Sequence, residues 1–217
     1  MSGGFRAAMI LSFRGSALCQ ELEGTDCLPR GARPAADIPP VTPSDPFDSA
    51  SNLRDLAVLY GELEELLALD PERLAAVVPE RSGWSAEQHL AHVALANELV
   101  LRNLASLVAG TGALIVRDVE PHARAVAVLA EGRIPRGQAQ SPRMVRPPER
   151  VQRELLTQWI ADGRSALAAL DAARVVPGEL RIPHQLLGPL DGPQWARFAV
   201  VHTRHHLEIV RDVLGRE

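Results

Sequence analysis

The stretch DGPQWARFAVVHTRHHLEIVRDV, residues 191–213, decides the fold class because its apolar and imidazole side chains recur at helical spacing. Asp191 is a good helix N-cap, and Pro193 is acceptable in a first helical turn. The spacings along the stripe are 3, 4, 4, 3 and 4 residues, which place its members on one helical face. That face consists of Trp195, Phe198, His202, His206, Ile209 and Val213. The stretch therefore predicts a long terminal helix that turns two imidazoles towards the core.

Three segments upstream also predict long helices. Residues 51–69 carry leucines at helical spacing. Residues 85–108 begin with Ser85, the N-cap of an S-x-x-Q capping box that Gln88 closes. Residues 147–173 begin with two prolines, and the inward positions expected there are Val151, Leu155, Trp159, Leu167 and Leu170. Four such helices without a predicted strand pair indicate an all-α four-helix bundle, in which metal sites are commonly built between facing helices.

The segment between the second and third long helices is less regular. A short helix is expected within residues 121–132, and the loop after it holds four arginines. Because loops are normally exposed, we expect these arginines to be solvated rather than to bind an anion. They are Arg133, Arg136, Arg143 and Arg146. A short helical turn at residues 71–78 and an irregular connector at residues 174–192 complete the predicted domain.

The N-terminal part of the chain has a different composition. Six prolines lie between residues 29 and 46, and the apolar run at residues 7–13 is too short to span a bilayer. Cys19 and Cys27 show no metal-binding spacing, which makes a reducing cytoplasm the expected location. We expect residues 1–48 to be a Pro-rich, disordered or loosely packed extension, and residues 49–217 to form the four-helix domain of a protein without membrane contact.

Composition excludes several classes of function. The 217-residue chain has a formal net charge of −4 and only 4% aromatic residues, so nucleic-acid binding is not expected. All 23 basic residues are arginines, which excludes Schiff-base chemistry on a lysine. Five of the seven histidines fall in two short windows, and the functional site is expected there.

Three of these histidines share inward helical faces. His202 and His206 can bind one divalent cation together because imidazoles at i and i+4 point the same way, although a hydrogen-bonded core pair is the alternative. His92 lies on the expected inward face of residues 85–108 and can supply a third imidazole. Three protein ligands leave positions open for water or substrate, which is typical of catalytic sites. Zinc is the first expectation, with nickel, iron or manganese as alternatives.

The other four histidines are assigned lesser roles. His89 and His205 lie one helical turn from His92 and His202, but further from the centre of each stripe. Both remain alternative ligands, and we expect His205 to orient a ligand or to lie at the rim of the site. His122 and His184 are expected in loops.

Two motifs resemble those of a known family. GWSAEQHLAHV, residues 83–93, resembles the W-S-x-x-E-x-x-x-H motif that begins the second helix in the DinB-like superfamily of metal-binding four-helix bundles. Residues 182–210 resemble its terminal helix, where an H-x-x-x-H pair follows a Gly-containing loop and an aromatic-rich turn. The resemblance covers roughly residues 51–214. One departure is Gln88, where the family often has Glu, which preserves the capping box but weakens any role for a carboxylate there.

The resemblance implies a metal triad of His92, His202 and His206, the residues that helix geometry also selects. The family includes bacterial transferases and isomerases that use bacillithiol, mycothiol or glutathione, besides stress-induced proteins, and it is unrelated to the DNA polymerase called DinB. We expect a metal-dependent enzyme of thiol S-transferase or isomerase type, with a low-molecular-weight thiol and a small-molecule substrate. The alternatives are a non-catalytic, metal-stabilised, stress-related or ligand-binding bundle, and a metal-dependent hydrolase. A homodimer through exposed helix faces is the alternative to a monomer.

Overall fold

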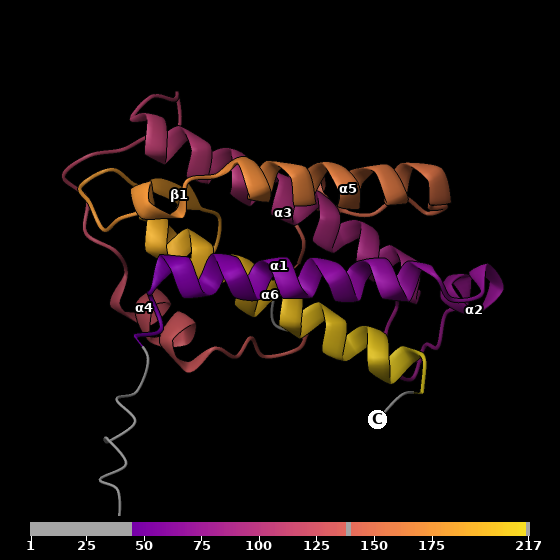
Figure 1. Cartoon of the computed structure of the whole chain (residues 1–217). Helices are drawn as coiled ribbons and strands as arrows, with labels where there is room; N and C mark the ends of the chain where they lie inside the picture. Colours follow the sequence, from indigo (N-terminus) through magenta and orange to yellow (C-terminus); the bar gives the residue numbers. More distant parts are fainter. Residues whose placement is uncertain (1–44, 138–139, 216–217) are drawn as a thin grey trace, which may run out of the picture. The chain divides into compact units, whose positions relative to one another are not determined.

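Four long helices form the bundle in the computed structural model, which describes residues 45–137 and 140–215. They are α1 (Ser49–Leu67), α3 (Ala86–Ala109), α5 (Arg153–Ala169) and α6 (Gly192–Val213) (Figure 1). Helix α6 packs against α3 and α1, and α5 packs against the same two helices. The predicted all-α four-helix bundle is therefore confirmed.

Shorter elements connect the long helices. They are α2 (Pro71–Ala75), α4 (Ala123–Glu131) and the 3-10 turns η1 (Arg143–Val145) and η2 (Ala172–Arg174). The short helices expected within residues 71–78 and 121–132 are thus present. The leucines at helical spacing on α1 are buried, namely Leu53, Leu56, Leu59, Leu63, Leu66 and Leu67.

Most of the expected N-terminal extension, residues 1–44, lies outside the described residues, and so do Cys19 and Cys27. The division into an extension at residues 1–48 and a domain at residues 49–217 stays a prediction. Within the ranges that the structure describes, no helix combines the length and the apolar character needed to cross a membrane.

The third long helix begins later than the sequence predicts, at Arg153 rather than at Pro147. The side chain of Gln88 on α3 explains this difference. Its Nε2 donates hydrogen bonds to the carbonyl oxygens of Pro148 (3.2 Å) and Glu149 (3.3 Å). A helix that began at the prolines would use those carbonyls for its own amides. The segment instead stays non-helical up to Gln152.

The buried face of α5 also differs from the prediction, since it consists of Leu156, Ile160, Gly163 and Leu167. The predicted inward position of Leu155 is wrong, because this side chain is 44% exposed. Gly163 accounts for the error. A glycine does not count as apolar in a sequence pattern, yet here the missing side chain makes room for the buried ring of Tyr60. The side chains at three other predicted inward positions are partly buried and pack against the core. They are Val151, Trp159 and Leu170.

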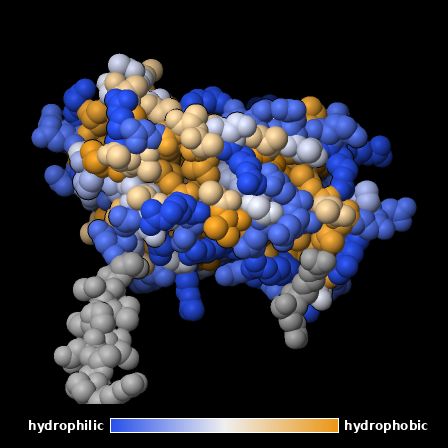
Figure 2. All heavy atoms as spheres, viewed as in Figure 1, coloured by the Kyte–Doolittle hydropathy of each residue, from blue (hydrophilic) through white to orange (hydrophobic). Residues whose placement is uncertain are grey.

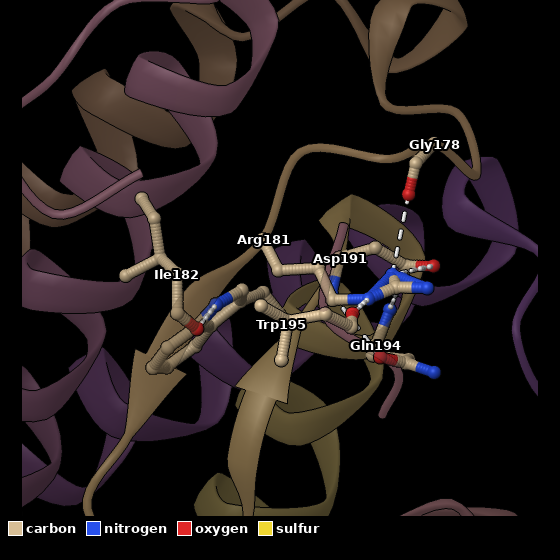
Figure 3. A network of polar contacts seen from close by, with 7 residues as sticks. Gly178, Arg181, Ile182, Asp191, Gln194 and Trp195 are labelled. Carbon is tan, nitrogen blue, oxygen red and sulfur yellow. Dashed lines mark hydrogen bonds and ion pairs between the residues drawn. The ribbon is translucent and has the colours of Figure 1, made fainter. Parts of the chain in front are cut away.

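The connector before α6 contains a hairpin that the sequence did not predict. Strand β1 (Ile182–His184) pairs antiparallel with β2 (Gly188–Leu190). Each strand is three residues long and contains a proline, which is tolerated because both strands are edge strands. The indole Nε1 of Trp195 donates to the carbonyl oxygen of Ile182 at 3.2 Å, which ties the hairpin to α6 (Figure 3).

An ion pair secures the start of α6 (Figure 3). Arg181 and Asp191 approach to 3.8 Å and are mostly buried. The Arg181 guanidinium also donates to the carbonyl oxygens of Val119 (2.6 Å) and Gly178 (3.2 Å). Asp191 accepts a hydrogen bond from the Gln194 amide at 3.0 Å in a complete capping box, as its predicted N-cap role requires. These contacts fix where α6 begins and how it is rotated.

Apolar side chains reach the surface in several separate places, among them the hairpin end of the bundle, and hydrophilic residues lie between these places (Figure 2). The exposed large hydrophobic residues include Leu114 in the loop after α3, and Val176 and Leu186 in the connector.

Candidate metal centre

Helix α6 contributes two imidazoles to the interior of the bundle. His206 is 8% exposed, and His202, one turn earlier, is partly buried. Their ring centroids lie 4.6 Å apart, and the ring of Phe198 stacks on His202 at 5.1 Å. The inward stripe that the sequence predicts therefore places both side chains next to each other.

Helix α3 contributes the third imidazole. Its start is fixed by the predicted capping box, in which Ser85 Oγ accepts from the Gln88 amide and the Gln88 side chain accepts from the Ser85 amide. His92 follows on the next turns and is 2% exposed. Its Nε2 lies 3.2 Å from Nε2 of His202. One nitrogen from each of His92, His202 and His206 lies within 4.8 Å of the others, so the structure brings the predicted triad together.

The backbone fixes the tautomer of His92. Its Nδ1 lies 2.7 Å from the carbonyl oxygen of Val145 in η1, and a carbonyl can only accept a hydrogen bond. The proton of a neutral His92 therefore sits on Nδ1, and Nε2 carries a lone pair directed at the triad. Such a bond to the outer nitrogen of a histidine is typical of metal-binding sites. No sequence pattern indicates this role for Val145.

His89 is more central than the sequence analysis expects. It is 4% exposed, and its Nδ1 lies 3.0 Å from Nδ1 of His206. Its Nε2 lies 2.8 Å from the Ser82 hydroxyl oxygen, which also accepts a hydrogen bond from the Trp84 amide. His89 precedes His92 by three residues and so shares its helical face, a signal that was available in the sequence.

The remaining histidines lie around the cluster. His205 is partly buried, and its ring centroid lies 5.0 Å from that of His206, which fits the expected rim position. His122 sits at the N-cap of α4. His184 was expected in a loop but belongs to β1, where its ring packs edge-on against Phe198 at 4.6 Å. Its Nδ1 accepts hydrogen bonds from two backbone amides of the hairpin turn.

Burial keeps the clustered imidazoles neutral. It lowers the pKa of His89 from 6.5 to about 4, and neighbouring positive charges act in the same direction. Burial, followed by the neighbouring imidazoles, lowers the pKa values of His202 and His206 well below 6.5. The pKa of His92 is also lowered by burial, against the opposing effect of its bond to Val145. At pH 7 the cluster therefore offers lone pairs rather than positive charges.

Two further observations concern the surroundings of the triad. Nδ1 of His202 is buried and has no hydrogen-bond partner among the described residues. The four loop arginines are exposed, as expected. One of them, Arg136, pairs with Asp212 on α6 at 2.5 Å.

These features define an all-α four-helix bundle with a buried histidine triad between two facing helices, an arrangement that fits metal binding. The sequence model of the DinB superfamily matches residues 39–210. The chain therefore belongs to the DinB superfamily. No curated protein and no solved structure matches the chain.

Proposed function

We propose that His92, His202 and His206 bind one divalent metal ion, and that the protein is a metal-dependent enzyme of thiol S-transferase or isomerase type. The observation that carries the proposal is the convergence of three neutral imidazoles from two facing helices. Nitrogens that share a tetrahedral ion at 2.0–2.1 Å lie about 3.3 Å apart. The 3.2 Å between Nε2 of His92 and Nε2 of His202 matches this separation. Three neutral imidazoles suit zinc, with nickel, iron or manganese as alternatives.

A bound divalent cation with an open position would lower the pKa of a thiol or water next to it. The protein's own side chains prepare the environment. Val145 holds His92 with its lone pair inward, and Phe198 and Trp84 cover the imidazoles with apolar rings. His202 is the least buried of the three ligands, so in this proposal a small molecule would approach the metal from its side. The two cysteines of the chain, Cys19 and Cys27, lie outside the described residues, and the thiol in this proposal is a separate low-molecular-weight cosubstrate.

The deep burial of His92 and His206 supports a second candidate function. A metal held there would tie α3 to α6 and stabilise the bundle without any catalysis. The protein would then be a metal-stabilised module that binds a ligand or responds to stress.

Elemental analysis of the purified chain tests the metal site. We expect close to one divalent ion per chain in the wild type and a loss of that ion in the His202→Ala, His206→Ala double variant. The control is His122→Ala, which removes a histidine at the N-cap of α4 and should retain the metal. Wild-type protein prepared without chelator that contains no metal and takes up none would refute the proposal.

A panel of thiols and electrophiles then separates the two candidates. The transferase proposal expects thiol-dependent consumption of an electrophile that the double variant on α6 cannot perform. The non-catalytic candidate expects a metal-dependent rise in thermal stability without consumption of any electrophile.

A further inference from the structure

His89 stands outside the proposed triad, but it contacts one member directly. Its Nδ1 faces Nδ1 of His206 at 3.0 Å, and its Nε2 faces the hydroxyl of Ser82 at 2.8 Å. Both imidazoles are more than nine-tenths buried, at 4% and 8% exposure. The three side chains therefore form a continuous hydrogen-bonded chain from the loop before α3 to α6.

Two proton arrangements satisfy this chain. In the first, the Ser82 hydroxyl donates to Nε2 of His89, and Nδ1–H of His89 donates to His206. A neutral His206 then carries its proton on Nε2. In the second, Nδ1–H of His206 donates to Nδ1 of His89, and Nε2–H of His89 donates to Ser82. Only the second leaves a lone pair on Nε2 of His206, the nitrogen that this contact does not occupy.

We propose that His89 is the positioning residue of His206: it accepts the Nδ1–H of His206, passes its own Nε2–H to Ser82, and thereby directs the Nε2 lone pair of His206 at the metal. This inference rests on the proposed metal site. In that site, His89 accepts the Nδ1–H of His206, just as the carbonyl of Val145 accepts the Nδ1–H of His92. Unlike a carboxylate, a neutral histidine can accept this proton without adding a negative charge to the buried cluster.

The assignment makes the three ligands unequal. The outer nitrogens of His92 and His206 each have a partner, whereas Nδ1 of His202 has none among the described residues. His202 is also the most exposed of the three. It is therefore the ligand whose orientation depends least on hydrogen bonding and most on packing against Phe198.

The test compares His89→Asn with His89→Leu, which have similar size. The amide oxygen of asparagine can occupy the place of Nδ1 and accept the proton of His206, whereas leucine cannot. We expect zinc affinity, measured by competition with a chromophoric chelator, to fall about 10- to 100-fold in the leucine variant. The asparagine variant and the control His122→Leu should stay within a few-fold of the wild type. Cobalt spectra of the leucine variant should show altered ligand-field bands.

Equal affinities of the wild type and the leucine variant would overturn the inference, as would an asparagine variant that is as weak as the leucine variant. Nitrogen-15 spectra of the metal-free wild type report the tautomer of His206 directly and need no substitution of His89. We expect the His206 signals, assigned by their loss in His206→Gln, to show a proton on Nδ1, and a proton on Nε2 contradicts the inference. A wild type that binds no metal refutes the proposed function instead. The tautomer of His206 then still shows whether His206 or His89 donates the proton in the hydrogen bond between them.

Discussion

Acidification should destabilise the metal-free protein through its buried histidines, and His184 gives the clearest case because it is not a proposed ligand. Burial lowers its pKa from 6.5 to about 4 in the folded protein. Between these two values the unfolded chain binds more protons than the folded chain. The free energy of unfolding therefore decreases as the pH falls through 6.5, and the loss is complete below about 4.

The size of the effect follows from the two pKa values. At pH 5 an unfolded histidine with a pKa of 6.5 is almost fully protonated, whereas a folded one with a pKa of about 4 is mostly neutral. The difference amounts to about 2 kcal/mol relative to pH 7. Burial lowers the pKa of His89 to about 4 as well, so His89 should contribute a similar amount. Together these two histidines would remove about 4 kcal/mol, a large part of the total stability of 5–15 kcal/mol of a typical domain.

Urea unfolding at pH 7 and pH 5, with a chelator present, measures this loss. The informative variant is His184→Asn, whose amide oxygen can replace Nδ1 as acceptor for the hairpin amides. We expect this variant to lose about 2 kcal/mol less than the wild type between the two pH values. Equal losses in the two proteins would show that burial does not hold His184 neutral, and would refute the reasoning.

Three further predictions follow from the packing and the site. Gly163→Ala should destabilise the protein by about 1–3 kcal/mol in urea unfolding because its Cβ would overlap the Tyr60 hydroxyl, and Tyr60→Phe should recover most of the loss. Gln88→Glu should cost about 1 kcal/mol in the same assay, since a carboxylate cannot donate to the carbonyls of Pro148 and Glu149. Excess zinc should raise the melting temperature of the wild type but not of the variant with both α6 ligands replaced by alanine.

Much of the fold could be predicted from periodic patterns. The helical stripes of α1 and α6 and the caps at Ser85 and Asp191 describe local preferences that the folded chain retains. The hairpin β1–β2 could not be predicted, because three-residue strands that contain proline carry no strand signal and depend on the contact with Trp195. The face of α5 was misassigned because Gly163 is buried for the space that it leaves, not for its hydrophobicity.

The candidate site was predictable to the extent that it lies on regular helices. The convergence of His92, His202 and His206 follows from two inward stripes on helices that face each other. The hydrogen-bond partners of their outer ring nitrogens depend on tertiary contacts. His89 could have been selected by its three-residue separation from His92, but nothing local indicates that its Nδ1 meets α6. The carbonyl of Val145 has no sequence signature, since every residue carries the same group.

Gln88 contacts both the start of α3 and the segment that precedes α5. Its Oε1 closes the capping box of α3, while its Nε2 holds the carbonyls of Pro148 and Glu149 outside a helix. The 3-10 turn η1, just before these prolines, carries Val145, whose carbonyl accepts the Nδ1 proton of His92. A glutamate at position 88 could perform only the first task, because a carboxylate has no proton to donate at neutral pH. The residue that departs from the family motif therefore joins the start of α3 to the segment before α5 through hydrogen bonds that a glutamate could not all make.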